Sequence, residues 1–258
     1  MTSLNWGTLV LTLYCLAHGV HPQDDLVGLA DWSHESPETW PGVCQTGTAQ
    51  SPIDISEANL VQVDNFEPLT FHGFDLTPDT AVLKNDGHSV GMDFIEGVDY
   101  HFPYFGLRVG QTIPTLSGGG LPGRFQFAGL HFHWGSESDE TVTGSEHTVE
   151  GQAYPMELHL VHFNADYGPS IGKAVNNITV TNPTDILAVV GVFAKLQEKD
   201  NPKLEPLYWA LDKISKSGES AKMSAFPLAD LLPRNTDGFY RYHGSLTTPA
   251  HGCNEAVI

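Results

Sequence analysis

Two histidines alternate with bulky apolar residues in the stretch LHFHWG, residues 130–135. Successive side chains of a β-strand point to opposite faces of the sheet, so His131 and His133 are expected to share one face. Phe132 and Trp134 then point into the opposite, apolar layer. The stretch therefore predicts a strand that carries function on one face and packs with the other.

The stretch MELHLVH, residues 156–162, shows a similar alternation. Glu157, His159 and Val161 are expected on one face of this second strand. His162 falls on the other face and is predicted to pack in the core. If the two strands are neighbours, three imidazoles converge and leave a fourth tetrahedral position open, as in a catalytic zinc site. A lone strand histidine is more often a half-buried packing residue, so the pattern alone leaves both alternatives open.

Short segments with strand character, separated by clusters of glycine and proline, run through the whole chain. Alternating or β-branched residues predict strands at 89–94, 124–134, 156–163 and 186–193. Strands and helices do not alternate regularly. This favours a mainly β (α+β) single domain around a large twisted, mostly antiparallel β-sheet with a few short peripheral helices. The clearest helix is predicted after Pro202, where apolar side chains recur at helical spacing, at Leu204, Leu207, Tyr208, Leu211 and Ile214.

The chain is strongly acidic, with 12 Lys and Arg against 31 Asp and Glu in 258 residues, and its formal net charge is −19. A protein that neutralises phosphates needs Lys and Arg, so the charge argues against nucleic acid as a partner and against docking on anionic membranes. Between residues 20 and 107, fifteen acidic residues accompany one base, Lys84. A solvated acidic surface explains this asymmetry better than a cation-binding role. No membrane span is visible, because the only apolar stretch near that length lies at the N-terminus.

The N-terminus is predicted to be a secretory signal peptide, residues 1–19. An apolar run at residues 9–16 precedes AHG at residues 17–19, a small-x-small cleavage site. The first residues lack Lys and Arg, so a buried N-terminal helix is the alternative. Cleavage would leave 239 residues, 258 minus 19, as a single secreted domain at 20–258.

The chain has three cysteines, and cleavage of the signal peptide would remove Cys15. The remaining two, Cys44 and Cys253, are an even number in an oxidising compartment, which predicts one disulfide bond that closes a very long loop. Two free buried thiols are the alternative. Asn177, in the acceptor sequence Asn-Ile-Thr, is a predicted N-glycosylation site and is consistent with secretion.

Seven segments of the chain match one known family in their order and approximate spacing. They are SPETW (36–40), QSPIDI (50–55), NDGHSV (85–90), HFHWG (131–135), GSEHTV (144–149), ELHLVH (157–162) and GSLTTP (244–249). From Trp32 to the last residue, the chain resembles the α-class carbonic anhydrases. The resemblance implies a zinc enzyme that catalyses the reversible hydration of CO2 to bicarbonate and a proton, through zinc-bound hydroxide and a histidine proton shuttle.

The resemblance also implies how the metal is held. Zinc is the expected cofactor, bound by His131, His133 and His159. Glu157 matches the residue that accepts a hydrogen bond from the last of these histidines and thereby orients its ring.

Further residues match family positions around the metal. Thr247 would accept a hydrogen bond from zinc-bound hydroxide and donate its own proton to Glu146, because a hydroxyl that must donate to a carboxylate can only accept from the hydroxide. Thr248 matches the bicarbonate site. His88 matches the proton shuttle, since an imidazole pKa of about 6.5 allows it to accept and release a proton near neutral pH. The apolar wall that receives CO2, the small-molecule substrate, is matched by Val161, Val189 and Leu246.

Three features depart from the family pattern. Gly129 stands where the family commonly has a glutamine that accepts from the first zinc histidine. Such partners contribute roughly 10- to 100-fold to affinity or activity, so we expect a functional but impaired site. His251 and Gly252 resemble a two-residue insertion before Cys253, so the disulfide requires a bulged loop. The chain ends at Ile258, in a run typical of a strand just beginning, where the family continues with further strands. We therefore expect a C-terminally truncated sequence.

The alternative function is that of a non-catalytic carbonic-anhydrase-like binding protein or an acidic biomineral-matrix protein. The acidic N-terminal half keeps a matrix role open, but no repeated acidic tract supports it. Inactive relatives usually lack a zinc histidine, whereas this chain keeps all three together with Glu146 and Thr247. A different zinc hydrolase is disfavoured because the HExxH helix motif is missing. The sequence thus favours the enzyme.

Overall fold

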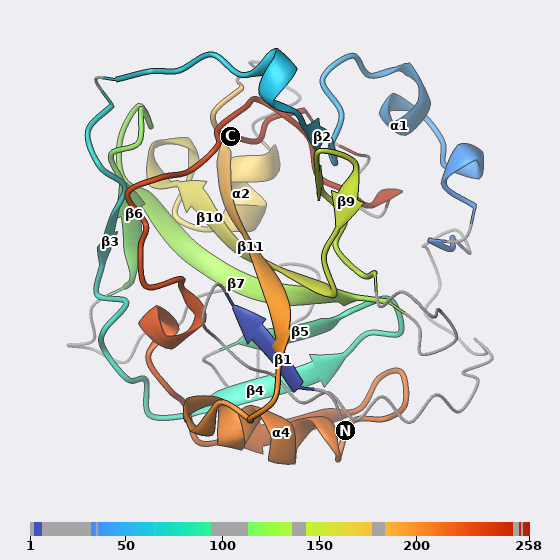
Figure 1. The fold of residues 1–258 in the computed structure, drawn as a ribbon, viewed down its shortest axis with the longest axis vertical. Coiled ribbons are helices and arrows are strands. Elements are labelled where there is room, and N and C mark those ends of the chain that lie inside the picture. The colour runs from blue at the N-terminus through green and yellow to red at the C-terminus, as the bar shows by residue number, and fades with distance from the viewer. Residues whose placement is uncertain are drawn as a thin grey trace.

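The computed structural model describes residues 3–6, 32–34, 36–64, 66–93, 113–135, 143–176, 184–249, 253 and 255–258. A nine-stranded antiparallel sheet forms its centre (Figure 1). Seven of the strands follow the order β1-β11-β10-β7-β5-β4-β12, and β6 joins β7 to β3. This is the mainly β architecture that the sequence predicts. The strands are β1 Ser3–Trp6, β3 Thr70–His72, β4 Ala81–Asn85, β5 Val90–Asp93, β6 Thr115–Ser117, β7 Phe125–Trp134, β10 Met156–Asn164, β11 Leu187–Gln197 and β12 Ser220–Met223.

A smaller sheet and a few short helices surround the large sheet. In the smaller sheet, β8 (Thr148–Val149) is parallel to β2 (Asp54–Ile55) and antiparallel to β9 (Gln152–Ala153). The predicted helix begins as a 3-10 turn at Pro202–Leu204 and continues as α4 (Glu205–Leu211), which packs against β12 and β4. The other helical segments described are α1 Val43–Thr46, α2 Ile171–Asn176 and the 3-10 turns Pro37–Thr39, Glu57–Asn59, Ala165–Tyr167 and Leu228–Leu231.

Strands β7, β10 and β11 are the longest described and lie side by side in the sheet. In the β7–β10 pair, His131 lies opposite His159 and His133 lies opposite Glu157. The two strands whose adjacency the histidine pattern required are therefore hydrogen-bonded neighbours. Because side chains alternate along each strand, these four residues share one face of the sheet.

The opposite face of these strands packs into the main hydrophobic core. Phe132 and Leu158 are almost completely buried and belong to a cluster that also contains side chains of α4. His162 lies in this interior as predicted, with its Nδ1 atom 3.1 Å from the carbonyl oxygen of Ala188 and its ring stacked on Phe74. Burial lowers the pKa of His162 to about 4, so the ring is neutral near pH 7 and adds no buried charge.

The two ends of the chain both pair with β11. Residues 3–6, within the predicted signal peptide, form β1 and pair antiparallel with the end of β11. At its start, Leu187 forms a bridge with Val257, in agreement with the strand expected to begin at residues 256–258. Residues 7–19 lie outside the described residues, and cleavage of the signal peptide stays a prediction.

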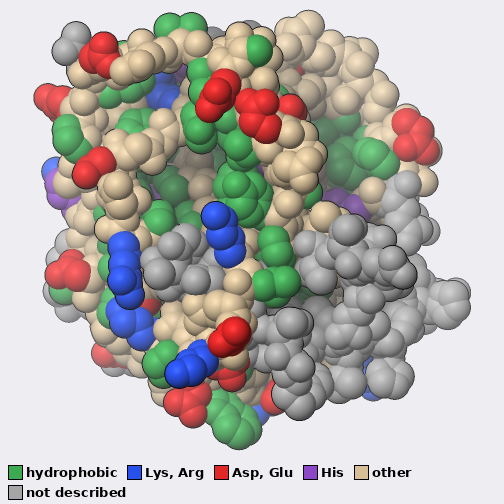
Figure 2. Space-filling model, in the orientation of Figure 1, with side chains coloured by type: hydrophobic (Ala, Val, Ile, Leu, Met, Phe, Trp, Pro, Cys, Tyr) green, Lys and Arg blue, Asp and Glu red, His purple; other side chains and the backbone are tan. Residues whose placement is uncertain are grey.

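The surface in Figure 2 carries acidic side chains that are dispersed rather than gathered in one patch. On this face, the distribution agrees with a solvated acidic surface. No helix among the described residues is both long and apolar enough to cross a bilayer.

The structure contains the predicted disulfide bond between Cys44 and Cys253, which are 209 residues apart in the sequence. The backbone N–H of Cys253 donates to the carbonyl of Thr248, at 3.3 Å. Gln50 donates to the carbonyl of Cys253 at 3.1 Å. The disulfide thus ties α1 to the segment that follows Thr248.

Replacing Cys44 with Ser is expected to lower the free energy of unfolding by roughly 2–5 kcal/mol, because the bond restricts a very long loop of the unfolded chain. Chemical denaturation of the purified protein measures this change. The parent chain under reducing conditions is the control and should match the variant. Two free thiols in the oxidised parent, found by mass spectrometry, would contradict the pairing.

Candidate metal centre

Three imidazoles converge on one face of the large sheet. His131 and His133 come from β7 and His159 from β10, and ring nitrogens of the three lie within 4.8 Å of one another. The ring centroids are 4.9, 5.2 and 4.6 Å apart. Two adjacent strands and the two-residue spacing within β7 are enough to produce this arrangement. Three such imidazoles can hold a metal ion and leave a further position open.

The state of His133 fits a metal ligand. Its Nε2 atom is buried and has no hydrogen-bond partner. Burial, together with the neighbouring His159 and His131, lowers the pKa of His133 well below its usual range. The ring is therefore neutral and keeps a free lone pair, which is the form that binds zinc. Burying a polar atom without a hydrogen-bond partner is unfavourable, and a metal ion bound by all three imidazoles would give this nitrogen a partner.

Glu157 fixes the orientation of His159. Its Oε1 atom lies 2.7 Å from Nε2 of His159 and 2.7 Å from Nδ1 of His147. Because Nε2 of His159 is engaged in this way, Nδ1 is the nitrogen left to face the other two histidines. A side chain at Gly191 would meet this carboxylate, since a Cβ atom there would lie 3.0 Å from Oε1 of Glu157.

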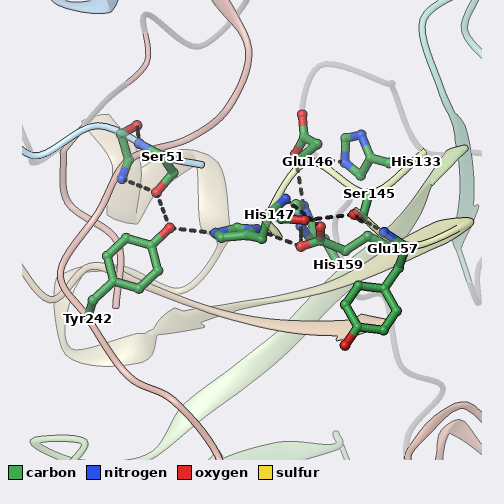
Figure 3. Close-up of polar contacts among 10 residues, drawn as sticks. Ser51, His133, Ser145, Glu146, His147, Glu157, His159 and Tyr242 are labelled. Atoms are coloured by element: carbon green, nitrogen blue, oxygen red, sulfur yellow. Dashed lines mark hydrogen bonds and ion pairs between the residues drawn. The ribbon is translucent and has the colours of Figure 1, made fainter. Parts of the chain in front are cut away.

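The hydrogen bonds of Glu157 continue away from the centre through three more side chains (Figure 3). Nε2 of His147 lies 2.6 Å from the hydroxyl of Tyr242, which in turn lies 2.6 Å from Oγ of Ser51. Ser51 and Ser245 exchange backbone-to-side-chain hydrogen bonds of 2.8 and 3.0 Å. We call Glu157, His147, Tyr242 and Ser51 the Glu157 network. It anchors the metal centre to the segments that carry Ser51 and Ser245.

Glu146 lies beside the three histidines. Its Oε2 atom is 3.4 Å from Nε2 of His133 and 3.8 Å from Nδ1 of His159. Burial raises the pKa of Glu146, while His159 and a hydrogen bond from Thr247 partly offset this increase. A cation held by the histidines would favour the ionised form further. The threonine and glutamate predicted to act together are thus hydrogen-bonded.

The residues predicted to receive CO2 lie together. Val161 and Val189 are opposite each other in the β10–β11 pair, and both pack with Leu246 against a small cluster of buried apolar side chains. The three side chains are partly buried, and their role in receiving CO2 stays a prediction. Thr248, predicted at the bicarbonate site, is partly buried two residues beyond Leu246.

His88 lies in the tight turn between β4 and β5. The carboxylate of Asp86 accepts from the backbone N–H groups of His88, at 2.8 Å, and Ser89, at 2.6 Å. Gly87 has φ +93°, a conformation that favours glycine. The ring of His88 is exposed and stacks on Trp32, with centroids 4.0 Å apart.

Other predicted features are placed only in part. Gly129 of β7 lies opposite Val161, and the weakening expected from this glycine stays a prediction. Asn177, His251 and Gly252 lie outside the described residues.

Three histidines, one buried and two partly buried, lie beside a threonine–glutamate pair on an antiparallel sheet. This arrangement is typical of zinc enzymes with three imidazole ligands, for which carbonic anhydrase is itself the reference case. The family model of the eukaryotic-type carbonic anhydrases matches residues 30–258. The chain belongs to this α-class carbonic anhydrase family.

Curated relatives agree with this assignment. The chain is 35% identical over 214 residues to carbonic anhydrase 12 of Homo sapiens, a match that covers 82% of this chain and 52% of the relative. It is 31% identical over 263 residues to carbonic anhydrase 4 of Rattus norvegicus, covering 97% and 74%. It is 36% identical over 245 residues to carbonic anhydrase 15 of Mus musculus, covering 92% and 65%. The chain thus spans between about half and three quarters of the length of these relatives.

Proposed function

We propose that this chain binds zinc through His131, His133 and His159 and catalyses the reversible hydration of CO2 to bicarbonate and a proton. The observation that carries the proposal is the buried Nε2 atom of His133, which has no hydrogen-bond partner and lies among three imidazoles. The names of the relatives point to the same activity. When bound, zinc supplies a Lewis acid that makes water nucleophilic near neutral pH, chemistry for which carbonic anhydrases are the standard example.

Thr247 and Glu146 orient the reacting oxygen in this proposal. The hydroxyl of Thr247 donates its proton to Glu146, so its oxygen can only accept a hydrogen bond from the reacting group. An acceptor in a fixed place selects one orientation of that group and directs a lone pair toward the substrate.

The apolar surface of Val161, Val189 and Leu246 holds CO2 by contact alone, because the molecule has no net charge. Thr248 offers a hydroxyl to the bicarbonate product. His88 passes the released proton to solvent, since its side chain is exposed and imidazole is the side chain suited to proton transfer near neutral pH.

Secretion and N-glycosylation at Asn177 belong to the same proposal. The disulfide bond between Cys44 and Cys253 supports an oxidising compartment. An acidic matrix protein without catalysis is the competing function.

Replacing Thr247 with Val tests the proposal. We expect the zinc-loaded parent to hydrate CO2 in a stopped-flow assay and the variant to be slower by about 100-fold, the size of effect that misorientation produces. The zinc content should stay equimolar, because Thr247 is not a ligand. Thr70→Val, on the exposed side of β3, is the matched control and should keep full activity. A zinc-loaded parent that does not hydrate CO2 would favour the non-catalytic alternative.

A further inference from the structure

A second histidine lies beside the proposed proton shuttle. The ring of His34 is 6.4 Å from the ring of His88, centroid to centroid, and the two are inclined at 67°. Trp32 contacts both of them, stacked on His88 at 4.0 Å and edge-on to His34 at 4.9 Å. Trp40 closes the group with an edge-on contact to Trp32 at 5.6 Å. We call these four residues the Trp32 cluster.

The backbone holds both imidazoles of this cluster in place. The indole N–H of Trp40 donates to the carbonyl of Ser33, at 3.0 Å, next to His34. The β4–β5 turn with its Asp86 hydrogen bonds fixes His88. Two segments far apart in the sequence therefore bring one imidazole each to the same tryptophan.

The charge of His34 is coupled both to that of His88 and to that of one histidine of the metal centre. Although His34 is open to solvent, partial burial of its ring lowers its pKa, and the charge of His88 lowers it further, while Asp86 raises it. The charge of His34 also acts on His133, after the larger effects of burial, His159 and His131. His34 is thus in ring contact with His88 and is electrostatically coupled to His133.

We infer that His34 and His88 form a two-imidazole relay that carries the proton of CO2 hydration to solvent. This inference rests on the function proposed above. The O–H bond of the water that supplies the proton breaks, and a ring nitrogen of one imidazole accepts the proton with its lone pair. A buffer base later removes the proton and regenerates the neutral ring. The two positive charges repel each other, so protonation of one ring favours release from the other. Trp32 contacts both rings and so keeps the two imidazoles close to each other.

Replacing His34 with Gln should lower kcat several-fold in dilute buffer and leave kcat/KM unchanged. Proton release follows the step that consumes CO2, so it limits only kcat. Free imidazole added to the assay should restore kcat, because it substitutes for the lost ring. His72→Gln is the matched control, since His72 lies on β3 and contacts Ser117. It should behave as the parent in every buffer.

A second measurement needs no metal and no activity. In the zinc-free protein, an NMR titration should show that His88→Gln raises the pKa of His34, because a repelling charge is removed, whereas His72→Gln leaves it unchanged. Unchanged titration of His34 in the His88 variant would overturn the relay. A loss of kcat in His34→Gln that imidazole cannot restore would overturn it too, since this indicates a structural role.

Failure of the relay can be distinguished from failure of the proposed function. If the zinc-loaded parent hydrates no CO2 even in concentrated buffer, the proposed function is wrong and the relay falls with it. If the parent is active and His34→Gln equals it in dilute buffer, the relay alone is wrong.

Discussion

Replacing His159 with Ala is expected to abolish stable zinc binding and CO2 hydration together. The variant keeps only His131 and His133 as protein ligands, and two imidazoles on one strand do not form the three-ligand site that holds zinc. Zinc affinity should fall by more than the roughly 100-fold loss that follows from removing a supporting partner of a ligand. Competition with a chelator, together with metal analysis of the purified protein, measures this loss.

The matched control for this experiment lies on the same strand. His162 belongs to β10 but packs in the core on the opposite face, so His162→Gln should leave zinc binding intact even if it lowers stability. An equimolar zinc content in His159→Ala would show that the metal is held elsewhere. Equal loss of zinc in both variants would mean that folding of β10, not ligation, controls the result.

The strands that carry the candidate site could be predicted because they are long and clearly patterned. The run at 124–134 corresponds to β7, Phe125–Trp134, and the run at 156–163 to β10, Met156–Asn164. Polar residues on one face alternate there with apolar residues that are buried in the core. A one-residue shift would turn the histidines into the main core and the core residues to the opposite face. The pattern therefore determines which face each side chain occupies as well as the presence of the strand.

The Glu157 network could not be predicted in the same way. Ser51 and Tyr242 are 191 residues apart, and Tyr242 is 95 residues from His147. Ser51, His147 and Tyr242 each stand in a short segment with no periodic pattern that would pair it with another residue of the network. His147 and Ser51 belong to motifs that match the family, GSEHTV and QSPIDI, and this was the only available signal. Their side-chain contacts depend on how loops close, which local sequence does not encode.

The pairing of residues 3–6 with β11 also had no sequence signal. These residues were assigned to a signal peptide, where hydrophobicity and not strand alternation is the pattern. β1 is a strand of four residues at the edge of the sheet, and its backbone pairs with the open hydrogen-bonding edge of β11. The unpaired backbone groups of an edge strand can pair with segments of many different sequences. Such a pairing is therefore hard to predict from sequence.

Replacing Glu157 with Gln is expected to weaken both the metal centre and the fold. The carboxylate is 1% exposed and accepts three hydrogen bonds, from Nε2 of His159, Nδ1 of His147 and the backbone N–H of His147. Burial by itself would raise the pKa of Glu157, but the hydrogen bonds from His147 and His159 and their charges together lower it below its usual range. The carboxylate of Glu157 is therefore ionised and accepts hydrogen bonds from all three donors.

Glutamine has the same shape as glutamate, but its NH2 group replaces one of the two carboxylate oxygens. At least one of the donors that bind Glu157 therefore loses its acceptor. Zinc affinity should fall by roughly 10- to 100-fold because His159 is no longer held in one orientation. The zinc-free protein should also lose about 1–3 kcal/mol of unfolding free energy, the cost of an unsatisfied buried donor. Chelator competition gives the first value and chemical denaturation without metal gives the second.

Two further variants separate orientation of the ligand from general stability. Glu57→Gln changes an exposed carboxylate and should affect neither value. Tyr242→Phe removes the hydroxyl that contacts His147 but leaves the Glu157–His159 hydrogen bond in place, so it should reduce stability more than zinc affinity. If Glu157→Gln lowers stability while zinc affinity stays at the parental value, Glu157 supports the fold alone. The orientation of His159 is then fixed by its burial between β7 and β11 rather than by the carboxylate.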